Sequence, residues 1–250
     1  MTLKLRIKQR CFSFFLLATL LSAAVNGRTL VPFHIDLEGY QYAAVPVKVT
    51  GTQTLVQRGE GLWRLALELR GPLTRIEEWV DFRWVDGEPV PLEYRYNQRV
   101  PFNNESRRLR FEPEQQRIRV NLNDDAYTYP YDANVFDPLS YTLLLLNGLA
   151  RGETEFQFSV IDRRNPRHYE FSIATDTSVN EPHAVVIAQR VPARGITYIV
   201  LDTQWQIPTH FLRWRNDKLD QQIRALEARV GDRNVSDLPH WSDPRSNLPS

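Results

Sequence analysis

The chain has 250 residues, a net charge of +1 and a single Cys. Because acidic and basic residues are interspersed in nearly equal number, neither nucleic acid nor an anionic membrane surface is indicated as a partner. One Cys excludes an intramolecular disulfide and a cysteine-rich metal site, and the length is sufficient for one domain with a sizeable hydrophobic core.

A basic stretch followed by a short apolar run opens the chain. The apolar run extends from Cys11 to Val25 and contains small residues at its end. A spanning helix needs roughly 20 apolar residues, and this run is shorter. The order is typical of a secretory signal peptide, so we expect cleavage after Ala24 or Gly27 and removal of residues 1–27. An uncleaved N-terminal anchor is the alternative. The prediction is an exported protein, soluble and without a membrane span after cleavage.

From Tyr40 onward, apolar and polar residues alternate with a period of two, which predicts strands with one buried and one solvated face. The clearest runs lie at 64–70, 80–84, 92–97, 117–122, 155–160 and 168–173. Such alternation is typical of antiparallel sheets, and short turns such as Asp86-Gly87 favour hairpins between neighbouring strands. The predicted fold class is mainly β: a single antiparallel, strongly curved sheet or half-barrel in one β-rich domain over residues 28–230.

One segment, at about residues 138–150, departs from this pattern. Asp137 and Pro138 precede a leucine-rich stretch, and an acidic N-cap followed by Pro at the first position is typical of a helix start. We expect the Asp137 carboxylate to accept hydrogen bonds from the amides of the first turn. Because the segment is apolar nearly all round, the helix should be buried against or inside the curved sheet.

The segment from Lys218 to Val230 is ambiguous, because its apolar residues have helical spacing, Asp217 is a possible cap and Gly231 a possible stop. Beyond it, residues 231–250 are polar and rich in Pro, Ser, Asp and Asn. They are predicted to form a disordered tail.

Four short motifs carry a resemblance to a known family. They are Pro91–Tyr96, Phe136–Ser140, Phe156–Val160 and Ile207–Phe211. With the block from about Tyr40 to Glu227 in which they lie, they resemble the bacterial exported envelope family catalogued as domain of unknown function 3108. The resemblance implies an exported, β-rich protein of unassigned chemistry, and it makes 218–227 a final strand. Because tertiary context can override helix propensity, we predict a strand for 218–230.

Sequence motifs of catalysis are not found. There is no G-x-S-x-G elbow, H-E-x-x-H pair or phosphate-binding glycine loop, and the five histidines are scattered. The segment 121–132 departs from a calcium loop, since Asn121, Ala126 and Asp132 stand where Asp, Gly and Glu are usual. We therefore predict no enzyme, no metal and no cofactor, with a polysaccharide or ester hydrolase as the less favoured alternative.

Aromatic residues on the apolar faces of the strands are the candidate ligand-binding residues. They are Phe82, Trp84, Tyr94, Tyr96, Phe156 and Phe158. Large rings on a curved sheet either line a cavity or fill its interior. Alternation places Phe82 with Trp84, and Tyr94 with Tyr96, on strands joined by the Asp86-Gly87 turn, so these four could share one wall.

The functional prediction is a non-catalytic periplasmic protein that binds or carries an apolar ligand, such as a lipid or acyl chain, in the concave face of the sheet. In outline the predicted fold is similar to envelope lipid-carrier half-barrels. The alternative is an interaction partner or structural component of an envelope assembly, which would use an exposed sheet edge or the tail.

Overall fold

The computed structural model describes residues 29–42, 46–101, 104–175, 182–191 and 195–241. The predicted signal peptide, residues 1–27, and the end of the predicted tail, residues 242–250, lie outside the described residues. Within the described ranges, no helix has the length and apolar character needed to cross a membrane.

Strands account for most of the described chain. The first half contains β1 (Phe33–Tyr42), β2 (Pro46–Gly59), β3 (Leu62–Gly71), β4 (Thr74–Val85), β5 (Glu88–Arg99), β6 (Glu105–Glu112), a 3-10 turn (Pro113–Gln115), β7 (Arg117–Leu122) and β8 (Asp125–Pro130). The second half contains β9 (Val135–Phe136), α1 (Tyr141–Ala150), β10 (Glu155–Ile161), β11 (Pro166–Ile173), β12 (Ala184–Val191), β13 (Gly195–Asp202), β14 (Ile207–Arg215), β15 (Lys218–Val230) and β16 (Arg233–Val235).

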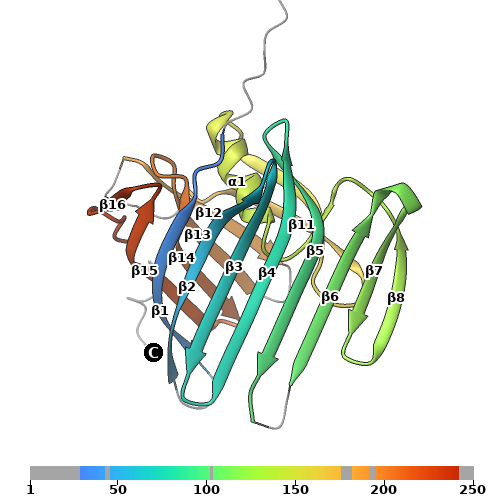
Figure 1. Ribbon diagram of the computed structural model, residues 1–250. Helices are drawn as coiled ribbons and strands as arrows, with labels where there is room; N and C mark the ends of the chain where they lie inside the picture. The colour runs from blue at the N-terminus through green and yellow to red at the C-terminus, as the bar shows by residue number, and fades with distance from the viewer. Residues whose placement is uncertain (1–28, 43–45, 102–103, 176–181, 192–194, 242–250) are drawn as a thin grey trace, which may run out of the picture.

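All these strands belong to one sheet, whose order is β8-β7-β6-β5-β4-β3-β2-β1-β15-β14-β13-β12-β11-β10-β9, with β16 paired to β15. Sequence neighbours therefore pair as two meanders, as predicted, and the meanders join where β1 runs antiparallel to β15. The sheet curves back on itself, with β1–β8 in front, β11–β14 behind, and α1 at one end (Figure 1).

The prediction of a purely antiparallel sheet is wrong at one place. β9 pairs with β10 in parallel, because the chain leaves the edge strand β8, crosses through residues 131–134 and joins the opposite edge beside β10. The sheet is thus mixed, and its path is open rather than closed into a barrel.

A β-bulge in β5 also changes the predicted alternation. The β4–β5 register shifts after Asp81, which pairs with Glu93, whereas Phe82 pairs with Pro91. Leu92 is the extra residue, so Pro91 and Tyr94 are both buried although they are three positions apart. Alternation over the run 92–97 predicts Leu92 on the same face as Tyr94 and Tyr96. That expectation is wrong at Leu92, because a bulge reverses the side-chain alternation.

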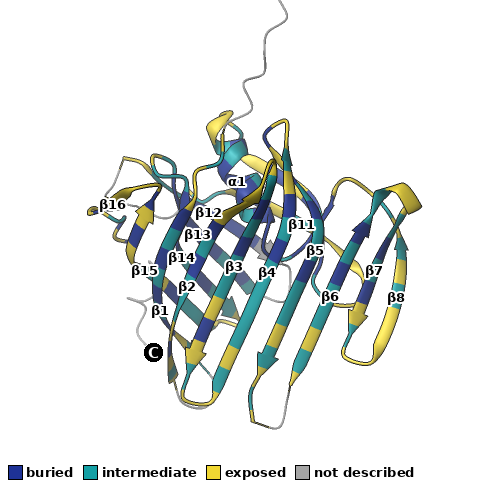
Figure 2. Ribbon diagram, viewed as in Figure 1, coloured by how far each residue is buried: buried dark blue, intermediate teal, exposed yellow. Residues whose placement is uncertain are grey.

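Two hydrophobic clusters pack against helix α1 and the turn that precedes it. The larger one packs the inner faces of β1–β7 against Leu139 and Leu143, and the smaller one packs the inner faces of β10–β13 against Leu145 and Leu146. Figure 2 shows buried residues on α1 and on the strand halves nearest to it, whereas the far ends of the β2–β6 hairpins are intermediate or exposed. The helix is buried, as predicted, and it closes the apolar end of the curved sheet.

The helix begins later than predicted. Residues 138–140 form a turn, and α1 itself starts at Tyr141. The buried Asp137 carboxylate accepts hydrogen bonds from the amides of Leu139 (2.8 Å) and Ser140 (2.9 Å), and also from the Ser140 hydroxyl. Asp137 therefore organises the turn that leads into the helix, because a short acidic side chain satisfies amides two and three residues ahead.

At the C-terminal end, one prediction is confirmed and another is wrong. Residues 218–230 form strand β15, as predicted from the family pattern against the helical spacing. Of the predicted disordered tail, β16 pairs with β15, and Trp241 is buried against Tyr198 on the outer face of β13. The physical reason is that β12–β14 carry apolar residues on both faces, so the outer face needs a cover that the tail supplies.

Candidate functional site

The six candidate aromatic residues separate into different environments. Phe82 and Tyr94 are fully buried in the larger cluster, Tyr96 packs at its margin, and Phe156 and Phe158 belong to the smaller cluster. Of the six, Trp84 alone lines one of the two cavities described below. Phe82 and Trp84 do share a face, with ring centroids 6.5 Å apart in an edge-on arrangement.

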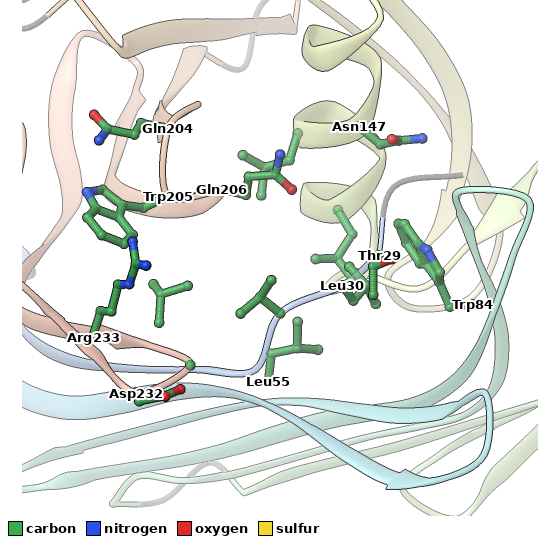
Figure 3. A pocket seen from close by; sticks show the side chains of 15 residues that line it. Thr29, Leu30, Leu55, Trp84, Asn147, Gln204, Trp205, Gln206, Asp232 and Arg233 are labelled. Atoms are coloured by element: carbon green, nitrogen blue, oxygen red, sulfur yellow. The ribbon is translucent and has the colours of Figure 1, made fainter. Parts of the chain in front are cut away.

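The cavity lies between one face of α1, formed by Leu143, Leu146 and Asn147, and the turns at the same end of the sheet, and its volume is about 430 Å³ (Figure 3). This volume is within the range of small-molecule sites. The apolar lining residues are Leu30, Val31, Leu55, Trp84, Leu143, Leu146, Trp205 and Val230. The polar lining residues are Thr29, Asn147, Gln204, Gln206, Asp232 and Arg233. An apolar interior with a polar rim is the usual composition of a site for an amphiphilic molecule.

The Trp84 side of the cavity is positioned by a contact between helix and hairpin. The Asn147 side-chain amide of α1 donates a hydrogen bond to the carbonyl of Gly87, in the turn that joins β4 to β5. Gly87 has a φ of 87°, a conformation that glycine adopts without strain. Trp84, three residues before Gly87, is thereby held beside the helix.

The opposite side of the cavity is built by the turn between β13 and β14. The buried Asp202 carboxylate accepts hydrogen bonds from the amides of Gln204 and Trp205, both at 2.9 Å. This side-chain turn fixes the direction in which residues 204–206 leave the strand. Trp205 is consequently presented at the cavity, where Figure 3 shows it beside Arg233.

The third wall joins the start of the described chain to the β15–β16 turn. The Gly231 amide donates a 2.8 Å hydrogen bond to the carbonyl of Pro32, and Gly231 has a φ of 58°. Asp232 and Arg233 follow in the same turn and are exposed. In Figure 3 the Arg233 side chain extends toward Trp205, whereas Asp232 lies away from it, below the cavity.

A separate polar group occupies the inner face of β4–β6. The Tyr94 hydroxyl donates to Glu78 Oε1 at 2.6 Å, and the Arg107 guanidinium lies 3.9 Å from the centre of the Tyr96 ring. Burial raises the pKa of the Glu78 carboxyl and, with the Glu78 charge, raises that of the Tyr94 hydroxyl. Arg107 is paired with Glu105 at 2.7 Å. Tyr94 and Glu78 satisfy each other, and Arg107 also donates a hydrogen bond to the carbonyl of Asp162, whereas Glu105 Oε1 and Arg107 Nε form an ion pair without a hydrogen bond. This arrangement suits a structural role.

A second cavity, of about 380 Å³, lies on the outer face of β14 and β15 beneath the C-terminal segment. His210 faces it, 6.2 Å from the Trp241 ring between centroids. Burial lowers the pKa of His210 to about 4, and the positive charges of His240 and Arg224 contribute in the same direction. A neutral imidazole at this contact allows the tail to pack, because a buried imidazolium would be poorly solvated.

In the part of the chain that the structure describes, no three His, Cys, Asp or Glu side chains form a group that could hold a metal ion. The walls of the first cavity offer apolar contact and hydrogen bonds, which suit binding.

Most of the cavity is not predicted by the sequence. Leu143 and Leu146 fall in the predicted helix with no expected role in binding, and no sequence motif marks Leu55, Trp205 or Arg233. A usable signal was Trp205, because a large apolar residue between Gln204 and Gln206 in a turn is typical of a contact surface. Arg233 gave no signal, since its place at the cavity depends on the β15–β16 turn.

Comparison with known proteins assigns the family. The sequence matches the family described as "Protein of unknown function (DUF3108)" over residues 35–206. The chain belongs to this family. The match includes Trp84 and the α1 wall of the cavity, whereas Arg233 lies beyond it. Among curated proteins, none matches this DUF3108 chain.

A solved structure shares the fold of this DUF3108 protein. It is described as a crystal structure of a beta-barrel-like protein of domain of unknown function DUF1849 from Brucella abortus, and it is similar with a TM-score of 0.55 at 9% identity. The similarity covers 82% of this chain and 100% of the other. At this identity the comparison supports the fold alone, a β-barrel-like sheet.

Proposed function

We propose that this protein is a non-catalytic periplasmic binding protein that holds the apolar part of a lipid or an acyl chain in the cavity beside α1. The observation that carries the proposal is the cavity itself. Its apolar walls come from Trp84, from α1 and from the chain entering β1, and its volume of about 430 Å³ suits a small ligand. The predicted signal peptide supports a location outside the cytoplasm.

Binding of decanol, an uncharged probe with a single alkyl chain, tests the proposal by calorimetry. Trp84→Ala should weaken binding about 10-fold, because it removes apolar contact worth about 1.4 kcal/mol. Trp79→Ala is the matched control: Trp79 lies on the same strand, on the face where Arg64 stacks on its ring at 4.0 Å, and it does not line the cavity.

A filling variant separates binding from folding. Leu30→Trp should occupy the cavity from the segment that enters β1, abolish decanol binding and leave the thermal midpoint unchanged or raised. Decanol binding that survives both Trp84→Ala and Leu30→Trp would contradict the assignment of this cavity, and no binding to the unmodified protein would contradict the function.

The location is tested independently. Intact mass of the protein recovered from the periplasmic fraction should correspond to cleavage near residues 24–27. A full-length chain found only in the membrane fraction would support the uncleaved anchor instead.

The alternative of a partner in an envelope assembly has one specific observation in its favour. β8 stands at the end of the sheet path, and half or more of its residues are exposed. An edge strand of this kind is available for pairing with another chain. Crosslinking from Thr128 in intact cells, with capture of a discrete partner and no decanol binding, would favour this alternative.

A further inference from the structure

Arg233 is the residue of this cavity that indicates the charge of the ligand. It lines the cavity, and no ion pair joins it to a carboxylate elsewhere in the described residues. Many arginines of the sheet are paired with carboxylates, such as Arg64 with Asp81 at 2.6 Å and Arg213 with Asp220 at 2.5 Å. A guanidinium at the mouth of an apolar cavity therefore retains its capacity to pair with a charged group of a ligand.

The arrangement around Arg233 favours an anion. Its side chain extends toward Trp205, and Gln204 lies on the same side of the cavity (Figure 3). Asp232 lies away from that guanidinium, so it does not occupy the same position. The planar fork of a guanidinium matches a carboxylate or a phosphate with two parallel hydrogen bonds.

The cavity also fixes the direction of the bound molecule. Arg233 and Trp84 lie at opposite sides of it, with Leu55 and Leu30 between them (Figure 3). A charged group cannot enter the apolar part without a large desolvation cost, so it stays at the Arg233 rim. An alkyl chain attached to it then extends toward Trp84 and α1.

We propose that the ligand of this cavity is an anionic amphiphile whose carboxylate or phosphate pairs with Arg233 while its alkyl chain lies against Trp84. This inference rests on the proposed function, because it specifies the ligand class of the same cavity. The carboxylate of a free fatty acid and the phosphate of a lipid share the required chemistry.

Three probes of equal chain length test the inference by calorimetry: decanoate, decanol and decyltrimethylammonium. Decanoate should bind most tightly and the cation most weakly. Arg233→Gln should weaken decanoate binding about 5-fold, the value of roughly 1 kcal/mol for a partly exposed ion pair, and leave decanol binding unchanged. Trp84→Ala should weaken decanoate and decanol equally, because both chains contact the ring.

Arg229→Gln is the matched control. Arg229 is exposed on β15, four residues before Arg233, and does not line the cavity. This variant carries the same change of net charge, so a loss of decanoate binding equal to that of Arg233→Gln would show a long-range effect and overturn the specific pairing.

The outcomes distinguish the two proposals. Equal binding of the three probes, with no effect of Arg233→Gln, would overturn the anionic ligand and leave the apolar binding function in place. No binding of any probe would overturn the function itself. Co-sedimentation with phosphatidylglycerol vesicles identifies the source: dependence on Arg233 there supports a lipid phosphate, and dependence on Arg233 with free decanoate alone supports a fatty acid.

Discussion

Acidification should weaken the outer-face packing through His210. The pKa of His210 is lowered from 6.5 to about 4, chiefly by burial and further by the charges of His240 and Arg224. On β15, Arg224 is itself paired with Glu38 of β1. In the unfolded chain the imidazole regains its usual pKa, so the unfolded state binds the proton first as the pH falls.

The sign and size follow from this difference. Above the unfolded value of 6.5 both states are neutral and the folded state is fully favoured; stability is then lost as the pH falls toward 4, where the loss levels off. Each pKa unit of difference between the folded and unfolded states corresponds to about 1.4 kcal/mol. The full loss in free energy of unfolding is therefore about 3 kcal/mol, of which about 2 kcal/mol is lost between pH 7 and pH 5.

Urea unfolding at pH 7 and pH 5 measures the effect. The unmodified protein should lose about 2 kcal/mol more between these conditions than His210→Gln, which has no imidazole to protonate. His168→Gln is the control, because the His168 side chain is 55% exposed on β11. If His210→Gln shows the same pH dependence as the unmodified protein, the reasoning about His210 is refuted.

Three further outcomes are expected. Asp137→Ala should lower the free energy of unfolding by about 1–2 kcal/mol, because it removes the acceptor of the turn before α1; an unchanged thermal midpoint would show that this turn does not depend on Asp137. Trp241→Ala should cost about 3–5 kcal/mol, because its ring is buried against Tyr198 on β13; a loss of less than 1 kcal/mol would contradict this packing. Tyr94→Phe should cost about 1–3 kcal/mol, since it removes the donor to the partly buried Glu78 carboxyl; a neutral result by chemical denaturation would mean that water replaces the hydroxyl.

The strands and their inner faces could be predicted because alternation is a local property. The runs around Leu65, Phe82 and Ile118 all form strands with these residues buried. Where a bulge intervenes, as at Leu92, the same rule fails, since the extra residue is specified by the partner strand rather than by its own neighbours. The choice of strand for 218–230 depended on family resemblance, because its local spacing favours a helix.

The cavity could be predicted only in part. Trp84 was identified because it lies on the apolar face of a strand, but Phe82 and Tyr94 carry the same signal and are packed in the core. The difference is their depth relative to α1, which the sequence of β4 and β5 does not encode. Trp205 and Arg233 reach the cavity through turns whose positions depend on the joined meanders, so no local pattern places them there.

The seam between the two meanders has a consequence for folding. Phe33 pairs with Val230, so the pairing at the middle of the sheet joins the residues most distant in the sequence among its strand pairs. Hairpins within each meander close short loops and form rapidly, whereas a contact across the chain has a large loop-closure entropy and raises the contact order. We expect the β1–β15 ladder to form last. Until the two halves meet, β1 and β15, which lie at the centre of the finished sheet, are therefore edge strands with one unpaired side.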